Sequence, residues 1–124
     1  MSDATLLLVD DESRILSSLR RALRREGYRI LVAGTPTEAL RILEEEPVDA
    51  ILSDHKMPGM SGLELLEAAS RMRPGAARLL ISGWPDAIPE ERLAAIGVRA
   101  LIPKPWNDDE LKRVLADALR SNAG

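Results

Sequence analysis

Cysteine and phenylalanine are both absent from this 124-residue sequence. The lack of cysteine excludes disulfide bonds, thiolate metal sites and cysteine nucleophiles. Aromatic residues make up only 2% of the chain, so aliphatic side chains have to fill the interior. No apolar run approaches the ~18 residues that span a bilayer, and the N-terminus lacks the basic-then-apolar order of a secretory signal. We therefore expect a cytoplasmic location and no membrane partner.

A surplus of basic residues is also missing, since 17 Lys and Arg stand against 20 Asp and Glu, a net charge of −3. Binding to a nucleic-acid backbone favours a basic surface, so no nucleic-acid partner is expected for this domain. The arginines at 20, 21, 24 and 25 are interpreted as a solvated helix surface near a favourable C-terminal dipole, with a docking patch as the alternative. The length fits one domain, 1–124, and not two.

Apolar stretches of strand length alternate along the chain with segments that repeat apolar residues at helical spacing. The predicted strands are 5–9, 29–33, 48–53, 78–81 and 98–102. Capping residues indicate two helix starts: Thr35 with Pro36 and Glu38, and Asn107 with Glu110. The first helix starts from Ser13, and the third begins at about Leu63. The fourth begins near Pro89 and ends at Gly97.

Five strictly alternating strand-helix units with apolar strands predict the α/β class. The expected fold is a doubly wound, five-stranded parallel sheet that five helices cover on both faces. Right-handed crossovers leave two common strand orders, of which 2-1-3-4-5 is one.

Polar residues follow the strand ends of this predicted sheet. They are Asp10 and Asp11 after the first strand, Asp54 after the third, Ser82 after the fourth and Lys104 after the fifth. Parallel strands deliver their carboxyl ends to one rim, so these side chains should meet there. Three converging carboxylates repel one another unless a cation joins them, and oxygen ligands suit Mg²⁺. A carboxylate nucleophile, a metal, an ammonium and a hydroxyl are the groups that phosphoryl transfer requires.

Each of these residues also has a simpler structural interpretation. The acids at 10–12 are suited to cap the following helix. Asp54 before a Pro/Gly loop and Ser82 before Gly83 are common turn residues, and Lys104 between two prolines suits a surface position. Four strand ends that each carry the required polar type favour a site over these separate explanations.

The same residues resemble the receiver domains of two-component response regulators, over essentially the whole chain. The matching motifs are the acidic pair Asp10-Asp11, Asp54 with Lys56-Met57-Pro58-Gly59-Met60 and Gly62, Ser82-Gly83, and Lys104-Pro105. The resemblance implies the flavodoxin-like receiver fold with strand order 2-1-3-4-5. It also implies that Asp54 accepts a phosphoryl group from the phosphohistidine of a sensor histidine kinase or phosphotransfer protein.

The resemblance further implies a Mg²⁺ cofactor. Asp11, Asp54 and the main-chain carbonyl of Lys56 would bind the ion directly, and Asp10 would act mostly through water. Such a domain catalyses only its own phosphorylation and dephosphorylation, so it is not an enzyme in the usual sense.

For the phosphoryl group, the resemblance assigns Lys104 to its oxygens and Ser82 to a switch hydroxyl. Receivers often carry Tyr or Phe three residues before the lysine, but Leu101 occupies that position here. We therefore expect weaker or different coupling to the face formed by the fourth helix, the fifth strand and the fifth helix. An output domain or partner protein is expected to dock there, with a phosphorylation-dependent homodimer as a further possibility.

Three side chains near the site carry further predictions. His55 is expected to face away from Asp54, because neighbouring residues of a strand point in opposite directions. Lys56 is expected near the site entrance, where it would influence attack of water on the phosphoaspartate. Trp84 and Trp106 are expected to pack against neighbouring helices, with a role in switching as the alternative.

Two other functions stay open. A phosphorylation-independent interaction module would retain the fold, and Leu101 is the residue that favours it. A phosphohydrolase with an aspartate nucleophile would use similar chemistry, but Lys56 stands where a proton-donating acid would be useful. The sequence leaves open whether the chain is part of a longer regulator.

Overall fold

The computed structural model describes residues 3–84 and 87–123, with side chains up to residue 120. The strands are β1 (Thr5–Val9), β2 (Arg29–Ala33), β3 (Ala50–Asp54), β4 (Ala77–Ser82) and β5 (Val98–Pro103). The helices are α1 (Ser13–Leu23), α2 (Pro36–Glu45), α3 (Gly62–Met72), α4 (Glu90–Ile96) and α5 (Asp108–Ala123). Strands and helices alternate as predicted.

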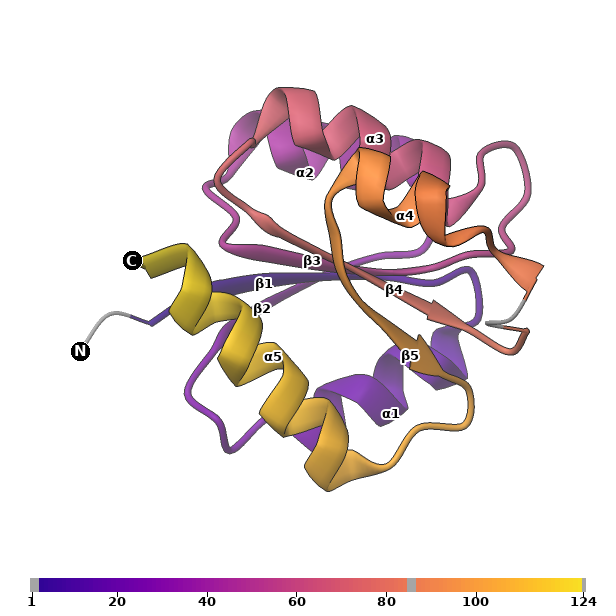
Figure 1. The fold of residues 1–124 in the computed structure, drawn as a ribbon. Coiled ribbons are helices and arrows are strands. Elements are labelled where there is room, and N and C mark those ends of the chain that lie inside the picture. Colours follow the sequence, from indigo (N-terminus) through magenta and orange to yellow (C-terminus); the bar gives the residue numbers. More distant parts are fainter. Residues whose placement is uncertain (1–2, 85–86, 124) are drawn as a thin grey trace.

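All the strand pairs are parallel, and the order β2-β1-β3-β4-β5 confirms the predicted topology. The helices form two layers around the sheet: α2, α3 and α4 cover one face, and α1 and α5 cover the other (Figure 1). A parallel sheet of this kind buries both faces, which explains why β1 and β3 are buried along their whole length.

Two aliphatic clusters, one on each face of the sheet, form the core. Leu7, Ile51 and Leu80 point toward the side of α2, α3 and α4, whereas Leu6, Leu52 and Leu79 point toward α1 and α5. Neighbouring strand residues thus contribute to opposite clusters, as the two-residue period of a strand requires. The prediction of an almost entirely aliphatic interior is confirmed for the described residues, because both clusters consist mainly of Leu, Ile, Val and Ala.

Strand β3 differs from its predicted range of 48–53, because it begins at Ala50 and includes Asp54. The chain enters the strand through Asp49, whose side-chain Oδ2 accepts a hydrogen bond of 2.7 Å from the backbone N–H of Thr5. Asp54 still pairs with Ile81 in the sheet. The ladder therefore fixes the backbone of Asp54 itself, which a loop position would not.

The helix caps were predicted in part. Thr35 accepts from the N–H of Glu38 at 3.1 Å, but the Glu38 side chain accepts from Gly34 rather than from Thr35. Asn107 accepts from the N–H of Glu110 at 3.0 Å. A complete capping box, which the sequence reasoning missed, joins Ser61 and Glu64 at the start of α3. It fixes the point at which the loop after Asp54 becomes helix.

Arg78 connects the start of β4 to the C-terminal end of α4. Its guanidinium donates to the carbonyl oxygen of Ile96 at 2.9 Å and to that of Ala76 at 3.1 Å. Gly97 ends α4 with a left-handed φ of 77°, as the sequence predicted, and this conformation favours glycine. The C-terminal end of α4 is thereby attached to the sheet.

Within the described part of the chain, no helix combines the length and the apolar character needed to cross a bilayer.

Candidate functional site

The carboxyl ends of the strands bring the predicted site residues to one rim of the sheet. Asp54 ends β3, Ser82 ends β4, and Asp10 directly follows β1. Lys104 follows β5, and its backbone N–H donates to the carbonyl oxygen of Ser82 at 2.9 Å. Parallel pairing thus places groups from four separate parts of the sequence next to each other.

Three carboxylates form the centre of this site. One oxygen each of Asp10, Asp11 and Asp54 lies within 4.8 Å of the others. Asp10 is fully buried and Asp54 is 5% exposed, whereas Asp11 is exposed to solvent. Burial raises the pKa of Asp10, and the charge of Asp54 raises it further against the lowering effect of a hydrogen bond from Glu12. The cluster therefore holds negative charge in a poorly solvated place.

Lys104 compensates part of this charge. Its Nζ lies 3.0 Å from Oδ1 of Asp54 and 3.2 Å from Oδ2 of Asp10, and its side chain is 19% exposed. Burial acts to lower the pKa of Lys104, but the hydrogen bond to Asp54 and the charges of both aspartates outweigh burial and raise it. Lys104 is therefore charged near neutral pH, and three carboxyl groups surround or adjoin this single ammonium.

The alternative in which the acids cap the first helix is confirmed in part, because Glu12 holds the N-cap position but forms no side-chain cap. Asp10 instead accepts the N–H of Glu12 at 2.9 Å through Oδ1, while its Oδ2 binds Lys104. The first acid therefore fixes the turn into α1 and belongs to the cluster at the same time.

These residues fit a magnesium ion. Mg²⁺ prefers oxygen ligands and is usually bound by one or two carboxylates together with water. The three aspartates provide those oxygens, and the exposed position of Asp11 leaves access for water.

A hollow of about 290 Å³ lies beside Ser82, the last residue of β4. Its lining consists of His55, Lys56, Ser82, Trp84, Ala87 and Ile88. The Oγ of Ser82 accepts the backbone N–H of Trp84 at 3.0 Å, and Ser82 is only 5% exposed. The predicted switch hydroxyl is thus held by the loop that follows it.

Lys56 and Trp84 form a contact that the sequence reasoning missed. The Nζ of Lys56 lies 4.9 Å from the centroid of the Trp84 ring, within the range of a cation–π interaction. Trp84 is 69% exposed, so the expectation that it packs against neighbouring helices is wrong. No periodicity connects two residues on different loops, and the contact emerges only when the sheet brings β3 and β4 together.

His55 lies in the same hollow. Burial lowers its pKa, while the neighbouring charge of Asp54 acts in the opposite direction. Its Nδ1 is buried without a hydrogen-bond partner among the described residues. The expectation that its side chain faces away from Asp54 stays a prediction.

Leu101 in β5 and Trp106 just after it pack on opposite sides of the sheet. Leu101 is half-buried, pairs with Leu80 in the sheet, and packs against the cluster under α2, α3 and α4. Trp106 is partly buried against the opposite cluster, as predicted, and its Nε1 donates to Asp108 at 2.9 Å. The switch position thus carries a packed aliphatic side chain without a polar tip.

Comparison with known proteins identifies the family. The family model described as "Response regulator receiver domain" matches residues 6–116. The chain belongs to the response regulator receiver family. A receiver domain protein from Methanospirillum hungatei JF-1, described as CheY-like, is 34% identical, with a TM-score of 0.90 and 98% of each chain covered. The signal receiver domain of an HD domain-containing protein from Pseudomonas fluorescens Pf-5 is 31% identical, with a TM-score of 0.92 and 98% of each chain covered.

Longer relatives are transcriptional regulators. The receiver is 38% identical over 119 residues to the hydrogenase transcriptional regulatory protein HoxA of Bradyrhizobium diazoefficiens, and the match covers 94% of this chain and 24% of HoxA. It is 34% identical over 123 residues to the transcriptional regulatory protein GlrR of Escherichia coli K12, which covers 97% of this chain and 27% of GlrR. The chain therefore spans about a quarter of the length of these relatives.

Proposed function

We propose that this receiver accepts a phosphoryl group on Asp54 from the phosphohistidine of a sensor histidine kinase or phosphotransfer protein, in a Mg²⁺-dependent reaction. A carboxylate oxygen of Asp54 attacks phosphorus, the P–N bond to the donor imidazole breaks, and the bonding electrons leave with the imidazole. The observation that carries the proposal is the contact of one ammonium, Lys104, with both Asp54 and Asp10 inside a cluster of three acids.

Asp11, Asp54 and the main-chain carbonyl of Lys56 would hold the magnesium ion, and Asp10 would hold it through water. The role of Asp10 is supported by its two hydrogen bonds, since both of its oxygens already accept from protein donors. When bound, Mg²⁺ supplies positive charge to the phosphoryl oxygens. The residues of the chain that orient the acceptor are Lys104 and the sheet ladder at Ile81.

Lys104 and Ser82 would bind the phosphoryl oxygens after transfer. Lys104 has only to exchange a carboxylate oxygen of Asp54 for a phosphoryl oxygen, because it already contacts the acceptor at 3.0 Å. Ser82 accepts a hydrogen bond from Trp84 but donates none to another described residue, so its proton is available to a phosphoryl oxygen. A rotation of this hydroxyl would weaken its bond to Trp84 and connect phosphorylation to the loop before α4.

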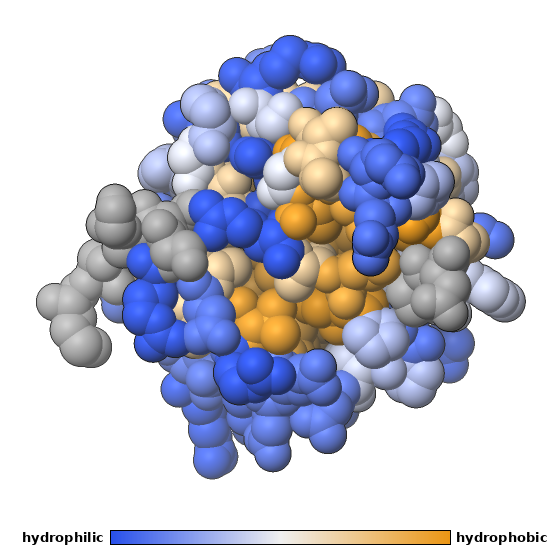
Figure 2. All heavy atoms as spheres, viewed as in Figure 1, coloured by the Kyte–Doolittle hydropathy of each residue, from blue (hydrophilic) through white to orange (hydrophobic). Residues whose placement is uncertain are grey.

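The surface between α4 and α5 is the proposed output face. Figure 2 shows apolar atoms gathered in the middle of this side of the molecule, where β5 runs between the two helices in Figure 1. Val98, Ala100 and Leu101 of β5 are only half-buried. We propose that an output domain or a partner protein covers this face, or a second receiver in a phosphorylation-dependent dimer, and that the protein works in the cytoplasm.

A phosphodonor assay tests the proposed chemistry. With acetyl phosphate or phosphoramidate and Mg²⁺, mass spectrometry should show the addition of one phosphoryl group to the wild-type protein. The addition should be lost in Asp54→Ala and on removal of Mg²⁺ with EDTA. An unmodified wild-type protein, or equal modification of Asp54→Ala, would contradict the proposal. A partner affinity that does not change in Asp54→Asn would instead favour the phosphorylation-independent module.

Removal of the Lys56 side chain should change the lifetime of the phosphoaspartate. The Nζ of Lys56 lies 4.9 Å from the centroid of the Trp84 ring, and Lys56 lines the hollow beside Ser82. On the proposed function, Lys56→Ala would give water easier access to the phosphoaspartate. We expect dephosphorylation to accelerate by roughly three-fold or more, the rate factor that corresponds to the free energy of one cation–π contact. Loss of phosphate can be followed by mass spectrometry, with Lys112→Ala as a matched control. An unchanged rate in Lys56→Ala would show that the contact has no part in the lifetime.

A further inference from the structure

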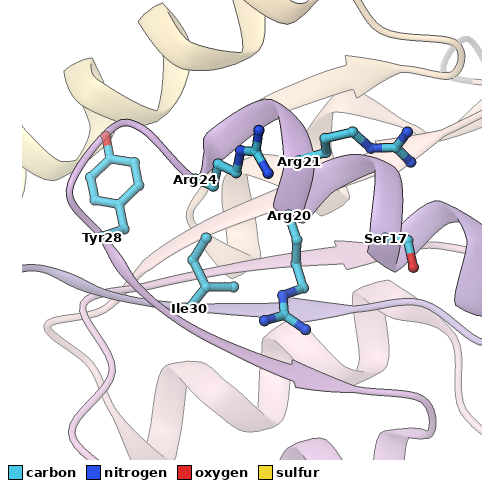
Figure 3. A pocket seen from close by; sticks show the side chains of 6 residues that line it. All are labelled: Ser17, Arg20, Arg21, Arg24, Tyr28 and Ile30. Atoms are coloured by element: carbon cyan, nitrogen blue, oxygen red, sulfur yellow. The ribbon is translucent and has the colours of Figure 1, made fainter.

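A second polar cavity lies away from the acidic rim, between α1 and the edge strand β2. It is an open groove of about 520 Å³, and its three arginines are exposed to solvent. Figure 3 shows the residues that line it, which are Ser17, Arg20, Arg21, Arg24, Tyr28 and Ile30. We call this cavity the arginine groove.

One face of a helix supplies the cations of the arginine groove. Ser17, Arg20, Arg21 and Arg24 follow the spacing i, i+3, i+4, i+7, which puts them on the same side of α1 and its C-terminal cap. Figure 3 shows Arg20 extending toward the β2 side, near Ile30, while Arg21 and Arg24 project from the helix in other directions. The three guanidinium groups therefore do not converge on one point, and only an anion with several charged groups could contact more than one of them.

Some surface arginines of this receiver form ion pairs, whereas the arginines of the groove form none with the described side chains. Arg29, Arg41, Arg113 and Arg120 each have a carboxylate partner within 4.0 Å. None of the ion pairs found in the part of the chain with described side chains includes Arg20, Arg21 or Arg24. Arg14, Arg25, Arg71 and Arg92 are also exposed and absent from these ion pairs, so the groove arginines share this property with other surface arginines.

Neighbouring arginines also repel one another along α1. Arg20 and Arg24 are four residues apart and Arg21 and Arg24 are three apart, spacings at which like charges destabilise a helix. The C-terminal dipole of α1 favours cations near Arg24. The dipole alone does not explain why Tyr28 and Ile30, which follow α1 in the chain, line a hollow beside these cations. A bound anion would relieve the repulsion and use the hollow.

The chemistry of the lining identifies the class of anion. The guanidinium groups donate in a planar fork that matches phosphate oxygens, and the hydroxyls of Ser17 and Tyr28 add two further donors. Ile30 and the body of the Tyr28 ring provide an apolar surface. Burial raises the pKa of the Tyr28 phenol, and the negative charge of Glu26 raises it further. Glu26 itself does not line the groove. No carboxylate therefore faces an incoming anion within it.

We propose that the arginine groove binds a ligand with two or more linked phosphate groups, such as a nucleoside diphosphate or inorganic pyrophosphate. The phosphates contact Arg20, Arg21 and Arg24, and any nucleoside lies against Tyr28 and Ile30. This site is separate from Asp54, and its function does not depend on phosphoryl transfer.

A single tyrosine makes the test direct. Tyr28 is the only tyrosine of the chain, so a tyrosine-selective isotope label gives one ring signal in the NMR spectrum, and this signal reports on the groove. Titration with ADP and with pyrophosphate, in EDTA to exclude metal-mediated binding at the aspartates, should shift this signal in a saturable manner. Isothermal titration calorimetry gives the affinity. A shift with both probes assigns binding to the phosphates, and a shift with ADP alone adds the nucleoside.

Two double variants distinguish binding at a specific site from a general effect of the protein's charge. Arg20→Ala with Arg24→Ala should weaken binding by about ten-fold or more, because each charge-assisted hydrogen bond contributes substantially. Arg41→Ala with Arg113→Ala removes the same charge elsewhere and should leave the affinity within about two-fold, as expected for surface substitutions away from such contacts. Equal weakening by both pairs, or no saturable shift with either probe, would overturn the proposal. Phosphorylation of Asp54 should be unaffected by either pair, so failure here is distinct from failure of the proposed phosphoryl transfer.

Discussion

Gly62→Ala should lower the free energy of unfolding by about 3 kcal/mol or more, because an added methyl group has no room there. A Cβ at this position would collide with the carbonyl oxygen of Asp54 and lie 2.8 Å from both Cα of His55 and Cδ1 of Leu80. Two of these three atoms are backbone, so they cannot move away as the end of a side chain does. The N–H of Gly62 also donates to the carbonyl oxygen of His55 at 2.7 Å.

The collision should also affect the site, because α3 would press on the strand end that carries Asp54. We therefore expect slower phosphorylation by acetyl phosphate in any Gly62→Ala protein that folds. Urea denaturation monitored by circular dichroism measures the stability. Gly34→Ala is the matched control, since a Cβ at Gly34 meets nothing within 4 Å, and its stability should equal or slightly exceed that of the wild type. Equal unfolding midpoints for Gly62→Ala and the wild type would show that the start of α3 can adjust.

The second large effect is a slower phosphorylation of the Lys104→Ala variant. If Lys104 binds the phosphoryl oxygens as proposed, loss of its ammonium removes a preorganised donor, and loss of one such donor slows a reaction by roughly 100-fold or more. The rate of phosphorylation by phosphoramidate measures this effect, with Lys112→Ala as control. A rate within about two-fold of the wild type would contradict the assignment of Lys104 to the phosphoryl oxygens, since removal of such a donor should cost far more.

Lys104→Ala should also change the response of the protein to metal. The variant leaves Asp10 and Asp54 buried without their shared ammonium, and a buried charge that loses its partner destabilises a protein by about 3–5 kcal/mol. Because a bound cation stabilises the folded state by mass action, Mg²⁺ should raise the melting temperature of Lys104→Ala more than that of the wild type. Equal shifts in both proteins would place the metal away from the carboxylates that Lys104 contacts.

Much of the site could be predicted because it depends on topology. Once alternating strands and helices indicate a parallel sheet, every strand end lies at one rim, and Asp10, Asp54, Ser82 and Lys104 follow from their positions after apolar runs. The helix boundaries at Thr35 and Gly97 could be predicted for a similar reason, because caps and left-handed turns depend on residues a few positions apart.

Features that depend on contact between different loops could not be predicted in the same way. The packing of Lys56 on Trp84 depends on the paths of two loops that share no periodic pattern. The tight position of Gly62 depends on how closely α3 approaches β3, whereas the sequence shows only a glycine in a loop. The limits of β3 were misjudged because Val48 looks like a strand residue, although the ladder with β1 starts at Ala50.

The attachment of α4 through Arg78 has a mechanical consequence. Arg78 binds the carbonyl oxygen of Ile96, and Gly97 follows with its left-handed turn, so the far end of α4 is fixed to the sheet. At its near end the N-cap, Pro89, makes no side-chain capping bond. A displacement of Ser82 and Trp84 should therefore change the tilt of α4, while its C-terminal end at Ile96 stays in place. With Arg78 holding the far end of α4, a small movement at the acidic rim would become a change of helix angle beside β5.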